Sequence, residues 1–154
     1  MVGHRFLLMM VTLGIFLGFI GCERGPKGVV RDKVSKVTGT LLIDGEPESM
    51  VAVRLIRVNG PDPEAGTSQV IVPSAYTDDE GKFTIGTYEG GPNADGAPKG
   101  DYAVVFQWGQ INLIGGNYAG DKFKGKYSDP EKSEIKLTVA DAPVDLGEIQ
   151  LSTK

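Results

Sequence analysis

Apolar and polar residues alternate over most of the chain after residue 36, and turn-forming residues separate the alternating runs. A period of two is typical of strands that bury one face and expose the other. No segment after residue 22 shows a convincing helical period of 3.6 residues. The pattern therefore predicts an all-β domain over residues 36–152, folded as a seven-stranded antiparallel Greek-key-like β-sandwich. The runs that define the seven strands are 37–43, 51–58, 69–77, 83–87, 102–108, 135–139 and 144–151.

Two of these runs carry local irregularities. Pro73 has no backbone N–H, so the run 69–77 is predicted to be an edge strand or a bulged strand. In the run 144–151 the apolar residues change from even to odd positions. A β-bulge at Gly147 would bring both halves of the run onto the inward face, and we expect one there.

The amino terminus follows a different pattern, because Arg5 is followed by an apolar run over residues 6–20. This run is shorter than the roughly 20 residues that span a bilayer, and it suits the apolar region of a secretory signal. We therefore expect an N-terminal signal helix before the β-sandwich. The apolar run leads into the tetrapeptide FIGC, which resembles the lipobox of bacterial lipoproteins. The resemblance implies cleavage between Gly21 and Cys22 and acylation of the Cys22 thiol, for example by palmitate. Phe19 departs from the pattern, which usually has Leu at that position.

Residues 1–21 are therefore predicted to be a lipoprotein signal peptide, and residues 22–35 a flexible tether of Gly, Pro and charged residues. The expected location is the cell envelope, with the lipid-anchored protein facing the periplasm or the exterior. Two alternatives are an uncleaved single-pass anchor and an ordinary cleaved signal that leaves a free thiol. An exposed unpaired thiol is reactive, and acylation removes it, which favours the lipoprotein.

The charge balance narrows the choice of partners. The chain has 16 Lys and Arg against 20 Asp and Glu, a formal net charge of −4. The leader holds Arg5 and no acid, so the remainder carries 15 against 20, or −5. An acidic domain repels phosphate backbones and anionic head groups. We therefore expect no nucleic-acid partner, and we expect contact with the membrane through the lipid anchor alone.

Five short motifs occur in order between residues 37 and 106. They are Gly39-x-Leu41, Asp44-Gly45-x-Pro47, Val51-x-Val53-x-Leu55, Thr77-Asp78-x-x-Gly81-x-Phe83 and Gly100-x-Tyr102-x-Val104-x-Phe106. This series resembles carboxypeptidase regulatory-like domains. The resemblance implies a transthyretin-like β-sandwich that serves as a non-catalytic surface module, and it implies no single biochemical activity.

The residues that most hydrolases and zinc enzymes require are scarce. The one histidine, His4, lies in the leader, and the one cysteine is Cys22. The mature chain therefore cannot form a Ser-His-Asp or Cys-His site or a usual zinc site, and we predict a protein that is not an enzyme, without metal or cofactor. The acidic turn 78–80 could serve a glycosidase or bind calcium. The acidic residues of this turn do not alternate with other residues as those of a calcium-binding loop do. Acidic residues in turns more often cap the turn and face solvent.

The connection 108–130 is the segment that most resembles a ligand-binding loop. A connection of this length without regular structure is uncommon and often functional, and aromatic side chains with polar tips suit binding. The predicted ligand-binding residues are Trp108, Asn117, Tyr118, Phe123 and Tyr127. In the alternative, Trp108, Phe123 and Tyr127 cap the open end of the sandwich.

The predicted function is a membrane-anchored envelope lipoprotein whose β-sandwich binds an envelope protein or a glycan. A purely structural lipoprotein and a carboxylate-based enzyme are the alternatives. Substitution of Trp108 or Tyr118 separates the first two, because it removes a partner in one case and alters only stability in the other.

Overall fold

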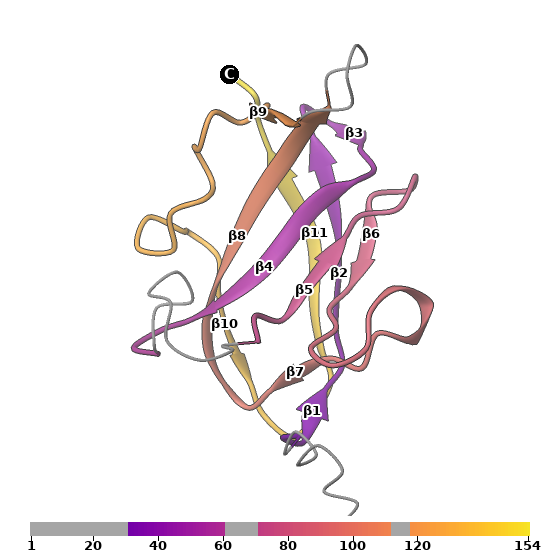
Figure 1. The fold of residues 1–154 in the computed structure, drawn as a ribbon, viewed down its shortest axis with the longest axis vertical. Coiled ribbons are helices and arrows are strands. Elements are labelled where there is room, and N and C mark those ends of the chain that lie inside the picture. Colours follow the sequence, from indigo (N-terminus) through magenta and orange to yellow (C-terminus); the bar gives the residue numbers. More distant parts are fainter. Residues whose placement is uncertain (1–30, 61–70, 112–117) are drawn as a thin grey trace, which may run out of the picture. The chain divides into compact units, whose positions relative to one another are not determined.

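The computed structural model describes residues 31–60, 71–111 and 118–154, which belong to one folded unit, Arg31–Lys154. The predicted signal helix and Cys22 lie outside the described residues. The described parts consist of strands and turns apart from one 3₁₀ turn, η1 (Gly91–Asn93). No helix in these parts is long and apolar enough to span a bilayer. The prediction of an all-β domain is confirmed (Figure 1).

The first sheet has the strand order β10-β8-β4-β5, and β9 also pairs with β8. Its strands are β4 (Val51–Arg57), β5 (Ser74–Tyr76), β8 (Gly100–Ile111), β9 (Tyr118–Asp121) and β10 (Lys136–Val139). Every pair in this sheet is antiparallel. The long strand β8 therefore lies at the centre of the sheet, between β4 and β10.

The second sheet is built around β2. It has the order β11-β2-β3, and β6 also pairs with β2. Its strands are β2 (Val37–Ile43), β3 (Glu46–Pro47), β6 (Lys82–Thr84) and β11 (Val144–Leu151). The chain passes repeatedly between the two sheets, so strands that are neighbours in sequence often belong to different sheets.

One pair departs from the predicted antiparallel arrangement. β11 runs parallel to β2, with Val144 opposite Val37 and Leu151 opposite Ile43. The prediction of an entirely antiparallel sandwich is therefore wrong for this pair. Residues 140–143 carry the chain from β10 in the first sheet to β11 in the second, so no hairpin fixes the direction of β11. Alternation of apolar residues indicates which face is buried but carries no information on strand direction.

A single apolar core lies between the two sheets and makes the unit a β-sandwich. β2 and β4 alternate buried and partly exposed residues, as a period of two predicts. Core residues come from strands of both sheets. The largest fully buried side chains are Tyr102, Leu41, Leu55, Ile85, Val37, Val51, Val53, Val104 and Val139.

Both irregularities predicted from the sequence are present. β11 changes register between Asp145 and Glu148, and Gly147 between them has a φ of 64°. Ile149 beyond the bulge is buried. β5 lies at an edge of the first sheet and follows Pro73, whose carbonyl accepts a hydrogen bond of 2.9 Å from the Leu55 N–H. The predicted bulge and the predicted edge strand are confirmed.

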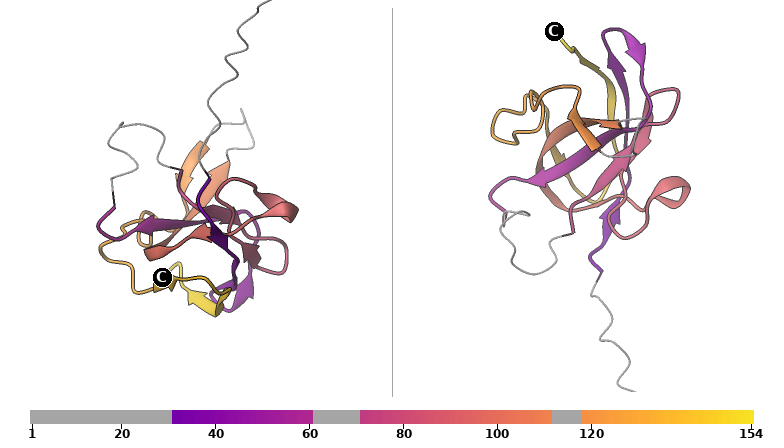
Figure 2. Two further views of the ribbon diagram at one scale, coloured as in Figure 1. Left: turned by 90° about the horizontal axis from the view of Figure 1, so that it is seen from below. Right: turned by 45° about the horizontal axis from the view of Figure 1, so that its top comes forward.

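The folded unit begins earlier than the predicted boundary at residue 36. β1 (Val34–Ser35) pairs with β7 (Ala97–Pro98), although residues 22–35 were expected to be a tether. Strands of two residues are too short for alternation to reveal. β1 lies at one end of the unit, and the carboxyl terminus lies with β3 and β9 at the opposite end (Figures 1 and 2).

Candidate functional site

A groove lies on the outer face of the first sheet, the face directed away from the core. β8 places Tyr102, Val104 and Phe106 in the core, so Ala103 and Val105 lie on the opposite face. These two residues are only 1% and 4% exposed, and they line a groove of about 820 Å³. This volume is in the range of pockets that hold small ligands. The outer face of the sheet is therefore hollowed rather than flat.

Two segments border this outer groove. The turn after β4, at Val58–Gly60, lines one part, and residues 128–131 line another. The segment 122–135, which contains the second border, is drawn in orange beside β8 in Figure 1. Lys136 on β10 donates a hydrogen bond of 2.8 Å to the Pro130 carbonyl, which ties this border to the sheet.

An ion pair also fixes the border at 128–131. Lys132 Nζ lies 2.8 Å from Asp129 Oδ2, and the Glu131 N–H donates to Asp129 Oδ1 at 2.9 Å. The hydrogen bond from Lys132 lowers the pKa of Asp129, with a further contribution from the Glu131 N–H. Asp129 therefore stays ionised at neutral pH, and its charge is balanced by Lys132.

Arg54 on β4 is the cation without a polar partner in the outer groove. Its neighbours across the strands are Val105 on β8 and Ser74 on β5. It is partly exposed, and no hydrogen bond or ion pair engages its guanidinium group within the described structure. A guanidinium presents several N–H donors in a planar fork that matches a carboxylate or a phosphate. Arg54 is thus available to an anionic group that enters the groove.

The predicted aromatic segment is organised around Asp121. Its Oδ1 accepts hydrogen bonds from the backbone N–H groups of Trp108 (2.9 Å) and Phe123 (3.1 Å). Its Oδ2 accepts one from the N–H of Gly125 at 3.0 Å. Lys122 Nζ lies 3.5 Å from the centroid of the half-buried Trp108 ring. A single carboxylate therefore fixes the turn that follows β9.

The aromatic rings of this segment pack against one another and against the core. Phe123 is 4% exposed, and its ring centroid lies 5.7 Å from that of Trp108 and 5.0 Å from that of Tyr127. The Tyr127 hydroxyl donates to the Ser152 carbonyl and accepts from the Ser152 N–H, both at 3.0 Å. Phe123 and Tyr127 therefore close the end of the sandwich and hold the carboxyl terminus there.

The side chains of the remaining predicted site residues lie outside the described part of the chain. Asn117 lies outside the described residues, and only the backbone of Tyr118 is described, in β9. Gly21 and Cys22 also lie outside. The structure thus brings Trp108, Phe123 and Tyr127 together as predicted, and the ligand-binding role of the segment stays a prediction.

The acidic turn before β6 has a structural role. Asp78 Oδ1 accepts hydrogen bonds from the backbone N–H groups of Glu80 (3.1 Å) and Lys82 (2.8 Å). Within the described ranges, no three acidic, histidine or cysteine side chains are grouped so that they could hold a metal ion. The Asp78 carboxylate caps this turn.

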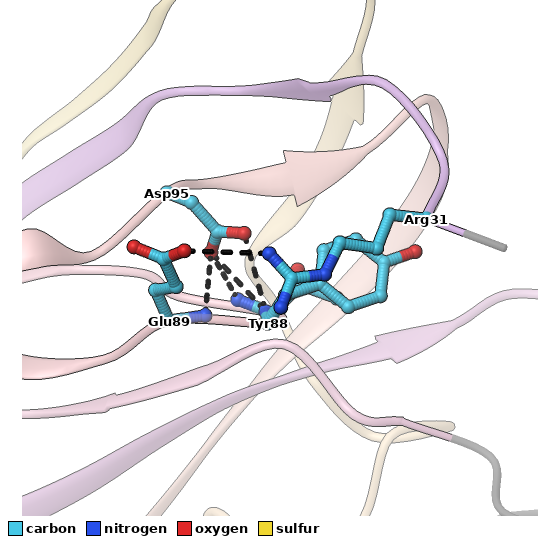
Figure 3. Close-up of polar contacts among 5 residues, drawn as sticks. Arg31, Tyr88, Glu89 and Asp95 are labelled. Carbon is cyan, nitrogen blue, oxygen red and sulfur yellow. Dashed lines mark hydrogen bonds and ion pairs between the residues drawn. The ribbon is translucent and has the colours of Figure 1, made fainter. Parts of the chain in front are cut away.

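A second carboxylate, Asp95, organises the loop between β6 and β7 (Figure 3). Its Oδ1 accepts hydrogen bonds from the N–H groups of Thr87 (2.8 Å), Tyr88 (3.2 Å) and Glu89 (3.3 Å). Arg31 pairs with Glu89 at 3.3 Å and lies over the Tyr88 ring. The loop is therefore fixed both internally and to the first described residue of the chain.

The pKa of Asp95 predicts a dependence of stability on pH. Burial raises this pKa, but the backbone donors Thr87, Glu89 and Tyr88 outweigh it and leave the pKa below its ordinary value of 3.8. A carboxyl group with a lowered folded pKa contributes stability above its unfolded pKa and loses it as the pH falls through the folded pKa. We expect Asp95→Asn to lower the free energy of unfolding by about 1 kcal/mol at pH 6. Urea unfolding between pH 6 and pH 2 should show this difference shrinking, and a difference independent of pH would contradict the assignment.

Comparison with known proteins assigns no family to this β-sandwich. No protein-family model matches the chain, and no curated protein matches it in sequence. A solved 9R-lipoxygenase from Cyanothece PCC8801 resembles it with a TM-score of 0.37 and 14% identity, over 83% of this chain. This chain spans only 18% of that lipoxygenase.

A second solved structure is a proposed carbohydrate-binding protein from Pseudomonas aeruginosa. It resembles this chain with a TM-score of 0.35 and 14% identity, over 80% of this chain and 92% of its own. Neither likeness is close enough to assign a function. The resemblance to carboxypeptidase regulatory-like domains stays a prediction from the sequence motifs.

Proposed function

We propose that this protein is an exported lipoprotein, held on a membrane of the cell envelope through Cys22. Its β-sandwich is a non-catalytic module that binds a ligand of the envelope, a glycan or a protein. The FIGC tetrapeptide at the end of an apolar leader supports the anchor. An anchored module of this kind acts by holding its ligand close to the membrane.

The observation that carries the binding role is the outer groove of the first sheet. It combines a hollow of ligand size with a cation, Arg54, that has no polar partner among the described residues. The outer face of a sheet that serves only to cover a core is usually flat and evenly polar. Here Ala103 and Val105 are buried on that face. They form a small apolar floor that polar residues surround.

The positions of the sequence motifs support a sandwich of the transthyretin-like kind. Asp44-Gly45 forms the turn between β2 and β3, and both residues have positive φ. Gly81 lies in the turn before β6, and Gly100 begins β8. The motifs thus occupy turns and strand starts of this sandwich, which supports the resemblance.

A purely structural lipoprotein is the second candidate. The packing of Phe123 and Tyr127 favours it, because these two residues stabilise the end of the sandwich instead of facing solvent. The two candidates differ in whether the outer groove contacts anything in the cell.

Photo-crosslinking in living bacteria tests the proposed binding role. A benzoylphenylalanine is placed at Gln107, which is exposed on the outer face of β8, or at Lys82, which is exposed on β6 in the second sheet. We expect a reproducible adduct, protein or glycan, from position 107 and none from position 82. Equal adducts from both positions, or none from position 107, would contradict binding through the groove and favour the structural candidate.

A further inference from the structure

The side chains that line the outer groove carry an excess of free positive charge. The lining cations are Arg54, Arg57 and Lys136, and the lining carboxylates are Asp129 and Glu131. Asp129 is neutralised by Lys132. The Arg57 guanidinium lies against the ring of Tyr102, whose side chain is in the core. Among the described lining residues, Arg54 and Lys136 therefore face the groove against one free carboxylate, Glu131. The chain as a whole has a net charge of −4. The groove is therefore a cationic site on an acidic protein, and it favours an anionic ligand.

The three cations are not equally available. Lys136 donates to the Pro130 carbonyl, and the Arg57 guanidinium lies 5.4 Å from the centroid of the Tyr102 ring and donates to its hydroxyl at 3.1 Å. Arg54 has no such contact within the described residues. Arg54 is thus the group that would form a new bidentate contact with a carboxylate.

An exposed aromatic ring lies on the same face as Arg54. Tyr76 on β5 is 66% exposed and is paired with Ala52, whose other neighbour is Gln107. Because Arg54 is paired with Ser74, Tyr76 and Arg54 are diagonal neighbours on adjacent strands, about 7 Å apart. A sugar ring that stacks on Tyr76 could therefore present a carboxylate to Arg54.

The shape of the outer groove favours a glycan over a protein as the ligand. Protein interfaces are usually broad, and their buried centres are apolar and aromatic. The floor here consists of Ala103, Val105 and Ile56, and the first two are almost fully buried, within a hollow of about 820 Å³. A ligand would therefore contact mainly the polar side chains around this floor, which suits a polar chain of sugar rings.

We infer that the outer groove binds an acidic glycan, one whose sugar rings carry carboxylates. Arg54 is the carboxylate-binding residue, and Tyr76, which lies on the same face beside the groove, is the stacking residue. The inference rests on the proposed binding function and specifies its ligand. Arg54 contributes the charge-assisted hydrogen bonds, and the remaining cations attract the polymer over a longer range.

Titration of the purified full-length protein tests this inference. The protein is kept in a polyoxyethylene detergent, which contains no sugar, and is titrated with a fluorescent hexamer of galacturonic acid or with its methyl ester. The variants are Arg54→Gln and the matched control Lys82→Gln, which removes one positive charge from the second sheet. Thermal unfolding establishes that both variants are folded.

We expect the wild-type protein and Lys82→Gln to bind the acidic hexamer within twofold of each other. Arg54→Gln should bind it at least tenfold more weakly, Arg54→Lys should fall between, and the methyl ester should bind weakly to all. Equal binding of acid and ester, equal loss in both Gln variants, or no binding to the wild type would overturn the inference. The crosslink from Gln107 is independent of ligand charge, so an adduct there would leave the proposed function standing.

Discussion

Replacement of Cys22 by Ser is expected to abolish labelling of the protein by an alkyne fatty acid and to leave the leader, residues 1–21, attached, because both acylation and cleavage depend on this cysteine. The thiol is the nucleophile that receives the lipid, and a hydroxyl is a far weaker nucleophile at neutral pH. Each buried methylene of an acyl chain contributes about 0.8 kcal/mol, so two or three chains hold a protein firmly on a bilayer. Fluorescence of the labelled band and the mass of the protein measure the two effects. Gly21→Ala keeps a small residue before Cys22 and should label like the wild type.

The alternatives to a lipoprotein give different results in the same experiment. An uncleaved anchor would leave the wild type unlabelled and with its leader attached, like Cys22→Ser. An ordinary signal peptide would leave the wild type unlabelled and soluble after export. Either result would contradict the lipid anchor at Cys22.

Substitution of Gly81 by Ala is expected to cause the largest loss of stability among the turn glycines considered. Gly81 has a φ of 71°, which disfavours any residue with a Cβ by about 1–2 kcal/mol. A Cβ at this position would also collide with the Leu41 carbonyl oxygen. The Gly81 carbonyl accepts a hydrogen bond of 2.8 Å from the Leu41 N–H, so relief of the collision disturbs this bond as well. We expect the free energy of unfolding to fall by about 3 kcal/mol and the Tm by on the order of 10 °C, measured by urea and thermal unfolding.

Gly45→Ala is the matched control for this prediction. Gly45 also has a positive φ, 92°, but a Cβ there would meet no atom within 4 Å. Its substitution should therefore lower the free energy of unfolding by only about 1–2 kcal/mol. Equal losses in the two variants would show that the contact with Leu41 contributes nothing.

The strands of this domain could be predicted from the sequence because each alternating run buries one face. Each of the seven predicted runs overlaps a strand, and the change of phase within the run 144–151 located the bulge at Gly147. The described residues hold eleven strands, so the predicted number was too low, because β1, β3 and β7 have only two residues each. The direction of β11 could not be predicted, because it depends on how residues 140–143 cross between the sheets. The strand β9 was missed because it is short and includes Gly120, which has a φ of 111°.

The outer groove was not predicted, although the sequence contains a signal of it. Residues 102–106 are all apolar, and a strand that is apolar at every position is covered on both faces. A period of two in this run accounts for Tyr102, Val104 and Phe106 as core residues. It does not explain why Ala103 and Val105, on the other face, are also apolar. The sequence does not indicate that Arg54 lies beside these two residues, because Arg54 belongs to another strand. Only the pairing of β4 with β8 places it opposite Val105.

The aromatic segment was predicted as a ligand-binding loop, and that role stays a prediction, while the packing of its rings required the structure. No pattern in the sequence indicates that Asp121 accepts three backbone hydrogen bonds or that Tyr127 is bonded to Ser152. These contacts depend on how the turn after β9 meets the carboxyl terminus.

The mass of the amino-terminal peptide of the protein isolated from bacterial membranes tests the central claim most directly. A protease digest analysed by mass spectrometry should contain a peptide that begins at Cys22 and carries the added mass of a diacylglyceryl group. A peptide that begins at Met1, or at any residue with Cys22 unmodified, would contradict the account of this protein as a lipid-anchored binding module.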